Sequence, residues 1–178
     1  MKRVTIPVLR VRPLVGDRTR GHLIVGSSVI PCALGRSGIV QVKREGDGGS
    51  PRGTFRLRGG AYRPDHLRIR PRTALPLRAT QPGDGWCDDP LDRRYNRPVR
   101  LPLPGVSAEE MWRQDGLYDL VIDLDCNRGP IRPGRGSAIF MHVARPGYRP
   151  TEGCVALARP DLARLLRRLG PRTVLTII

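Results

Sequence analysis

Glycine and proline recur along the whole chain, and this distribution limits the possible folds more than any other feature. The 178 residues include 21 glycines and 18 prolines. Both residues interrupt helices, glycine through its backbone freedom and proline through its missing N–H group. Such frequent interruption favours short strands joined by turns over a helical bundle. We therefore expect a β-rich protein whose length suits one domain over residues 1–178, with an apolar core that needs no metal or disulfide.

The charge is strongly basic but is not concentrated in one motif. The formal net charge is +16, and all basic residues except Lys2 and Lys43 are arginines. They are scattered from Arg3 to Arg172, and only two phenylalanines and four tyrosines are available to stack on bases. We interpret the charge as a general attraction to polyanions, or as the mark of an arginine-rich genome, and expect no nucleic-acid partner.

No segment of the sequence indicates a membrane span, a signal peptide or a metal site. Every apolar run is far shorter than the roughly 20 residues that cross a bilayer. Prolines and arginines interrupt the opening MKRVTIPVLRVRP, so no signal peptide is expected and the sequence alone indicates the cytoplasm. The cysteines lack C-x-x-C spacing, so we expect neither metal nor cofactor, and two disulfides are possible but not required. The cysteines are Cys32, Cys87, Cys126 and Cys154.

Local patterns predict strands at both ends of the chain and little regular structure in the middle. Repeated prolines make helix improbable between Pro64 and Pro104. A short helix is expected over 107–116, with Ser107 as N-cap and Glu110 as its capping-box partner. An amphipathic helix is expected over 158–171 from the spacing of Leu162, Leu165, Leu166 and Leu169. Strands are expected over 4–11, 23–25, 29–30, 54–57, 117–125, 136–142, 153–157 and 172–178.

One segment of the proline-rich middle concentrates side chains that commonly bind ligands. It is GDGWCDDPLDRRYNRPV, residues 83–99. Its aromatic, acidic and amide side chains suit one wall of a substrate groove. They suit equally a lid packed on the tryptophan, with the acids paired to neighbouring arginines. The candidates for substrate binding are Trp86, Asp88, Asp89, Tyr95 and Asn96.

A histidine and a cysteine near the end of the chain form a candidate catalytic pair. His142 ends one apolar run, and Cys154 opens the next after the loop VARPGYRPTEG. If the two runs are neighbouring strands, the loop brings their ends together, and the imidazole can activate the thiol. Gly153 would let the backbone approach a substrate, where main-chain N–H groups stabilise an oxyanion. The spacing alone is a weak signal, because a lone histidine more often completes a structural hydrogen bond.

Three ordered blocks make the signal more specific. GDGGSPRGTF, GRGSAIFMHV and TEGCVAL together resemble the L,D-transpeptidase catalytic domain (YkuD-like) family, from about Leu23 to the C-terminus. The early landmark of that family is matched by Asp47, Gly48, Ser50, Pro51, Gly53 and Phe55. The late landmark is matched by His142, Thr151, Gly153, Cys154 and Val155.

The resemblance implies a mainly β, single-domain sandwich with one or two helices and a cysteine acyltransferase activity. In the implied mechanism the Cys154 thiolate attacks an L,D peptide bond of a peptidoglycan stem peptide, and His142 carries the proton. Thr151 and a main-chain carbonyl near His142 would orient the imidazole. An amine of a second stem then takes the acyl group, which cross-links the cell wall and maintains cell shape. The implied partners are muropeptides and carbapenem-type inhibitors, the implied location is the periplasm or cell wall, and a monomer is expected.

The chain departs from the family pattern at two positions beside the pair. Val143 stands where many members have glycine, and Ala156 stands where many have a substrate-holding arginine. The segment around Trp86 points to a separate, short proteobacterial branch of the family. Basic residues flank the pair, where they suit the carboxylates of the stem or belong to a solvated loop: Arg132, Arg135, Arg145 and Arg149.

Two other functions remain open on sequence grounds. The same fold can carry an L,D-carboxypeptidase, or an amidase that releases an attached protein, and either would give products without cross-links. A non-catalytic module that binds polyanions is the other alternative, and there His142 and Cys154 would be structural. Mutation of Cys154 would leave such a module active.

Overall fold

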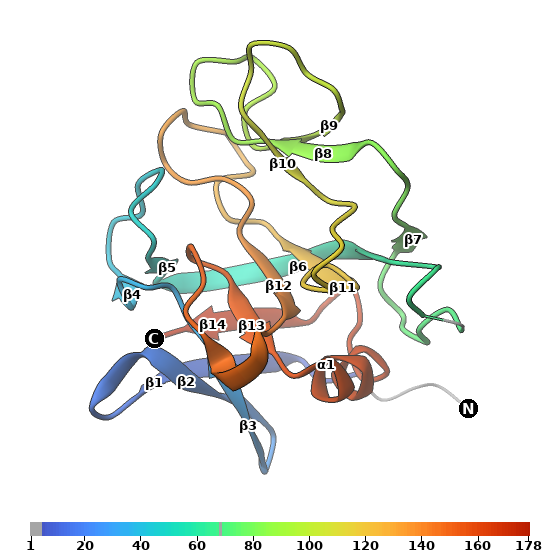
Figure 1. The fold of residues 1–178 in the computed structure, drawn as a ribbon. Coiled ribbons are helices and arrows are strands. Elements are labelled where there is room, and N and C mark those ends of the chain that lie inside the picture. The colour runs from blue at the N-terminus through green and yellow to red at the C-terminus, as the bar shows by residue number, and fades with distance from the viewer. Residues whose placement is uncertain (1–4, 68) are drawn as a thin grey trace.

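The computed structural model describes residues 5–67 and 69–178, and strands dominate it (Figure 1). The strands are β1 (Val8–Leu14), β2 (Asp17–Val25), β3 (Ser28–Ala33), β4 (Ile39–Val40), β5 (Ser50–Pro51), β6 (Gly53–Tyr62), β7 (Leu77–Ala79), β8 (Asp84–Cys87), β9 (Arg97–Arg100), β10 (Ala108–Glu110), β11 (Leu120–Leu124), β12 (Phe140–Val143), β13 (Val155–Leu157) and β14 (Val174–Ile177). The helical elements are a 3-10 turn, η1 (Pro146–Tyr148), and an α-helix, α1 (Arg159–Leu166). The expected mainly β domain with one or two helices is confirmed.

The main sheet closes on itself. Its order is β11-β12-β13-β3-β2-β1-β14-β6-β7, and β11 also pairs with β6, so eight strands form a mixed barrel. Most neighbours are antiparallel, but β12 runs parallel to β13, β1 to β14, and β6 to β7. The sandwich implied by the family resemblance thus takes the form of one closed sheet, whose walls surround the core. Closure pairs strand edges that an open sheet would leave exposed.

The interior of the barrel forms the larger of two apolar cores. On β1, Leu9 and Val11 are fully buried and alternate with exposed Arg10 and Arg12, as a strand with one buried face requires. The helix expected near the C-terminus is α1, which packs its buried leucines on this core. The strands expected from the sequence lie at or near their expected positions. Val4, the first residue of the strand expected over 4–11, lies outside the described residues.

A second, smaller sheet covers part of the outer wall of the barrel. β8 pairs antiparallel with β9 and β10 (Figure 1, top). On β12, Met141 and Val143 belong to the inner core, so the alternation of the strand turns Phe140 and His142 outward. An outer core fills the layer between the small sheet and the wall, formed by Trp86, Met111, Leu117, Tyr118, Val121, Ala138, Phe140 and Cys154.

The prediction of a short helix over 107–116 is wrong, because part of this segment forms a strand of the small sheet. Ala108–Glu110 form β10 and pair with Gly85–Cys87. The capping pattern at Ser107 is a local preference of about 1 kcal/mol, and pairing with a distant strand outweighs it. The proline-rich middle contains no helix among its described residues, as expected, but it does contain β7, β8 and β9.

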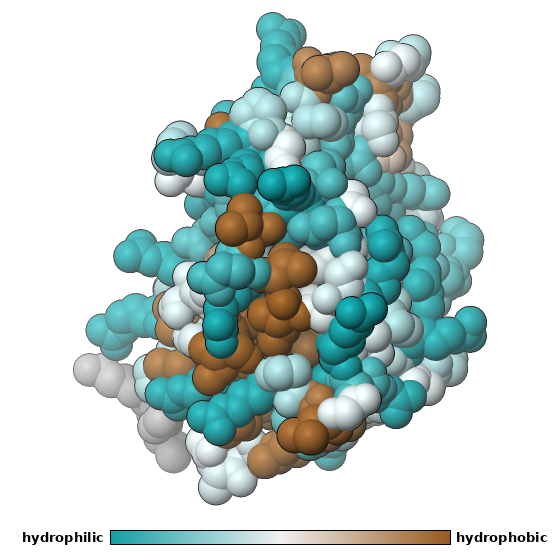
Figure 2. Space-filling view, turned by 90° about the vertical axis from the view of Figure 1, so that its left-hand side faces the viewer, coloured by the Kyte–Doolittle hydropathy of each residue, from teal (hydrophilic) through white to brown (hydrophobic). Residues whose placement is uncertain are grey.

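Hydrophilic side chains cover most of the face shown in Figure 2 and surround a narrower band of apolar ones. This agrees with the large excess of arginine in the sequence. In the described part of the chain, no helix is long and apolar enough to cross a membrane. All four cysteines are free and buried.

Candidate functional site

Cys154 lies immediately before β13, on the outer side of the barrel wall. In the parallel ladder of β12 and β13, Met141 pairs with Val155 and His142 with Ala156. The main-chain N–H of Phe140 donates a hydrogen bond of 3.2 Å to Sγ of Cys154, and the thiol donates one of 3.2 Å to the carbonyl of Ala138. Both contacts come from the neighbouring chain segment, so the β12–β13 pairing fixes the position of the sulfur.

His142 is held in one tautomer by its own strand. Its Nδ1–H donates to the carbonyl of Val143 across 2.8 Å, which leaves Nε2 as the proton acceptor. The ring of Tyr118 meets the imidazole edge to face, with centroids 5.3 Å apart. His142 and Cys154 line the same cleft, so the parallel strands bring together the two residues that the sequence paired.

Burial keeps both members of the pair uncharged in the free protein. It raises the pKa of Cys154 to about 12, and the nearby carboxylate of Glu109 adds to the effect. Burial lowers the pKa of His142 to about 4, although its bond to the Val143 carbonyl opposes the shift. At neutral pH the cleft therefore holds a thiol and a neutral imidazole, and the thiol would have to lose its proton in order to act as a nucleophile.

Thr151 and Gly153 shape the turn that presents Cys154. The hydroxyl of Thr151 donates to the carbonyl of Cys154 (2.7 Å) and accepts from the N–H of Gly153 (3.1 Å). Thr151 thus contacts the cysteine turn rather than the imidazole. Gly153 has a φ of +133°, and a Cβ there would lie 2.7 Å from the carbonyl oxygen of Gly49. The group that approaches the backbone closely at Gly153 is therefore the loop that contains Gly49.

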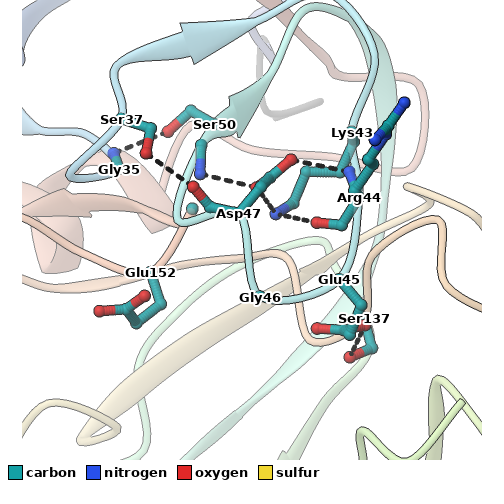
Figure 3. Close-up of polar contacts among 12 residues, drawn as sticks. Gly35, Ser37, Lys43, Arg44, Glu45, Gly46, Asp47, Ser50, Ser137 and Glu152 are labelled. Atoms are coloured by element: carbon teal, nitrogen blue, oxygen red, sulfur yellow. Dashed lines mark hydrogen bonds and ion pairs between the residues drawn. The ribbon is translucent and has the colours of Figure 1, made fainter.

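That loop, residues 43–50, forms one wall of the cleft and is organised by Asp47 (Figure 3). The carboxylate of Asp47 accepts hydrogen bonds from the N–H groups of Arg44 (2.7 Å) and Gly49 (2.8 Å), and it also pairs with Lys43. Glu45 extends from the loop to accept hydrogen bonds from the hydroxyls of Tyr95 and Ser137. The early sequence block therefore builds a rigid loop beside the cysteine.

The cleft has a volume of about 330 Å³ and a balanced set of charges. Its basic residues are Lys43, Arg113, Arg145 and Arg149, and its acidic residues are Glu45, Asp88, Glu109 and Glu152. Oδ1 of Asp88 is buried and accepts no hydrogen bond from the described residues. Within residues 5–67 and 69–178, no group of three His, Cys, Asp or Glu side chains is arranged to hold a metal ion.

The predicted substrate residues divide between the cleft and other parts of the molecule. Asp88, Arg145 and Arg149 line the cleft. Asp89 instead accepts the N–H of Leu91 within its own turn. Arg132 and Arg135 are exposed on the loop after β11 and do not line the cleft.

The aromatic and amide residues of segment 83–99 form a packed lid. Trp86 is buried against Phe140, with ring centroids 4.9 Å apart. Asn96 accepts hydrogen bonds from the Trp86 indole (3.0 Å) and the Ala138 N–H (3.2 Å). Tyr95 is also buried and binds Glu45. These side chains support the cleft from behind rather than lining it, and Asp92 pairs with Arg94 as the lid interpretation expected.

Several residues of the cleft were missed by the sequence analysis. Glu109 accepts a hydrogen bond from Tyr118, and Arg113 lies 5.4 Å from the centre of the Tyr118 ring. Burial raises the pKa of Glu109, with the Tyr118 hydrogen bond and Arg113 opposing the shift. Glu109 lies on β10 and Arg113 follows it, in the segment where a helix was expected. Lys43 and Glu45 lie just before the block GDGGSPRGTF, so the match to that block did not include them.

The model of one protein family matches residues 17–177, which include the barrel from β2 onward and the whole small sheet. The description of this family is YkuD, L,D-transpeptidase catalytic domain. Comparison with curated proteins and with solved structures gave no match.

Proposed function

The chain belongs to the YkuD family of L,D-transpeptidase catalytic domains, and we propose that it is a cysteine acyltransferase that cross-links peptidoglycan stem peptides. The observation that carries the proposal is that His142 on β12 and Cys154, immediately before the parallel neighbour β13, line one cleft. A thiol and an imidazole that share a cleft supply both the nucleophile and the base of acyl transfer.

In the first half-reaction, Sγ of Cys154 attacks the carbonyl carbon of the L,D bond while Nε2 of His142 takes the thiol proton. The new C–S bond gives a tetrahedral intermediate. When the C–N bond breaks, the imidazolium returns its proton to the departing amine, and a thioester remains on Cys154. The contacts of the sulfur with Phe140 and Ala138 hold it in position before the attack.

In the second half-reaction, the amine of another stem attacks the thioester. His142 takes a proton from the attacking nitrogen, the C–S bond breaks, and the cysteine is protonated again. The oxyanion of each intermediate needs main-chain donors near Cys154. The N–H of Gly153 is already donated to Thr151, so other N–H groups of the turn would serve.

The charges of the cleft suit a stem peptide, which carries both amines and carboxylates. We assign the acceptor amine to Asp88, whose buried Oδ1 lacks a partner among the described residues. The donor carboxylates would bind the arginines of the cleft, Arg113, Arg145 and Arg149. Ala156 is fully buried in the ladder between His142 and Ala33, so an arginine there would have to displace core atoms.

The test is to incubate the protein with purified muropeptides and to analyse the products by mass spectrometry. Transpeptidation gives dimers whose mass equals two stems less the released residue. Monomers shortened by hydrolysis would indicate a peptidase of the same fold. If the Cys154→Ala variant gives the same products as the original chain, both transpeptidation and hydrolysis by Cys154 are excluded.

A further inference from the structure

A second groove lies on the other side of the outer core, away from the cysteine. It has a volume of about 480 Å³, within the range of small-molecule sites, and it shares no lining residue with the cleft. We propose that this groove, which we call the Trp86 groove, binds a small organic anion with an aromatic or aliphatic body. This site is independent of the cysteine chemistry.

The floor of the Trp86 groove is apolar. Trp86, Met111, Val121 and Phe140 reach it from the outer core, which they share with Cys154. Gly59, Gly60 and Ala61 of β6 also line the groove, and a Cβ at either glycine would meet the backbone oxygen of Pro76 or Val121 at 2.7 Å or 2.3 Å. Burying an apolar body of ligand on such a floor contributes about 25 cal/mol for each Å² removed from water.

The rim of the groove carries an excess of positive charge. Arg58, Arg70 and Arg78 line it, and Asp123 is its one acidic lining residue. Asp123 is already paired with Arg128, at 3.2 Å, and lies 3.9 Å from Arg58. The side chains of Arg58 and Arg78 are half exposed, at 50 % and 55 %, so their guanidinium groups are accessible to a ligand, although Arg78 also pairs with Asp84 at 2.5 Å. A carboxylate or phosphate above an apolar floor therefore complements this site.

Phe140 separates the two sites. Its ring packs on Trp86 and lines the Trp86 groove, whereas its main-chain N–H contacts the sulfur in the cleft. The two sites therefore occupy opposite sides of one packed layer. A ligand bound to one site does not occupy the other, which allows variants to distinguish them.

The proposal is tested by titrating the full chain with four probes in a calorimeter. 2-Naphthoate and 2-naphthyl phosphate combine an apolar body with an anionic group, 2-naphthalenemethanol lacks the charge, and inorganic phosphate lacks the body. We expect both anionic naphthyl compounds to bind, and the alcohol and the phosphate to bind at least roughly tenfold more weakly. The better of the two anions identifies the headgroup. Equal binding of the alcohol and the anions would refute the role of the arginines.

Variants assign the site. Arg58→Gln should weaken naphthoate binding roughly tenfold, and Arg58→Gln with Arg78→Gln should weaken it further. Arg56→Gln is the matched control, because Arg56 is exposed on the same strand but does not line the groove, and it should bind like the unmodified chain. If the double variant fails to fold, the single Arg58→Gln variant gives the same answer. Loss of binding in Arg145→Gln but not in Arg58→Gln would place the ligand in the cleft and overturn the proposal.

Discussion

The N–H of Phe140 donates a hydrogen bond to the sulfur of Cys154 across 3.2 Å, from the strand that also carries His142. The proposed nucleophile is therefore positioned by the pairing of β12 with β13. Its surroundings are dry, since Cys154 is only 7 % exposed. Burial keeps this thiol protonated at neutral pH, and the following predictions depend on this arrangement.

Cys154 should be the first thiol to react with a limiting dose of iodoacetamide or a carbapenem. Burial raises the pKa of Cys154, Cys32 and Cys126 alike to about 12 and also raises that of Cys87, so ionisation in the free protein does not distinguish them. Of the four, Cys154 is the one that lines the cleft, together with His142. Peptide mapping should find one label per chain, on the peptide with Cys154, and slower labelling in His142→Ala. First labelling of Cys87, or equal rates in the two proteins, would contradict the assignment.

Removal of either member of the pair should abolish turnover to a similar extent. His142→Ala, Cys154→Ala and the double variant should each lose on the order of 10³-fold or more in kcat, because effects within one catalytic unit do not add. The measurement is the initial rate of dimer formation from muropeptides. Losses that multiply in the double variant would show that the two residues act independently.

Asp88→Asn should raise the KM for the acceptor stem roughly tenfold, because a neutral amide cannot pair with an ammonium group. Asp89→Asn is the matched control, since Asp89 is adjacent in sequence but caps its own turn outside the cleft. Steady-state rates at varied acceptor concentration separate the two. An equal effect of both substitutions would argue that only the general charge of the segment matters.

Asn96→Ala should destabilise the protein by about 2 to 4 kcal/mol, because it leaves buried donors and acceptors unpaired. Asn96 bonds to the Trp86 indole and the Ala138 N–H, and its amide donates to the carbonyl of Asn127 (2.9 Å). Urea unfolding followed by tryptophan fluorescence measures the loss. Arg93→Ala in the same segment serves as a control that should unfold like the original chain, and a small effect of Asn96→Ala would mean that the lid is not anchored by this residue.

Stability should fall as the pH is lowered from 6.5 to 4, through His142. Its pKa is about 4 in the folded protein and 6.5 ordinarily, so in this window the unfolded chain binds a proton that the folded chain does not. The loss approaches about 3 kcal/mol at the acid end. The free energy of unfolding, measured in urea at several pH values, should depend less on pH in His142→Gln.

The original chain must be compared with His142→Gln because Asp123 changes the free energy of unfolding in the opposite direction as the pH falls. Burial raises its pKa to about 6, although Arg128 and Arg58 oppose the shift, so the folded chain takes up this proton first as the pH falls. Its contribution cancels in the difference between the original chain and His142→Gln. Parallel curves for the two proteins would show that His142 is not held neutral.

Local patterns in the sequence determined the parts of this protein that depend on near neighbours. The leucines of α1 repeat at helical spacing, and the apolar runs that became β11, β12, β13 and β14 alternate with turns. The loop between His142 and Cys154 is long enough for a parallel connection, so the pair could be named before its geometry was known. The strand expected over 117–125 is β11, which ends at Leu124, so Cys126 lies in the turn that follows it.

The tertiary structure decided which side chains share the cleft. The pairing of β8 with β9 and β10 determines that Asp88 lines the cleft while Asp89 caps a turn. The same pairing places Glu109 in the cleft. Such contacts join residues that are far apart in the chain, so no local pattern carries them. The same holds for the charge state of the pair, because the desolvation that keeps Cys154 and His142 neutral arises only when the small sheet packs on the barrel wall.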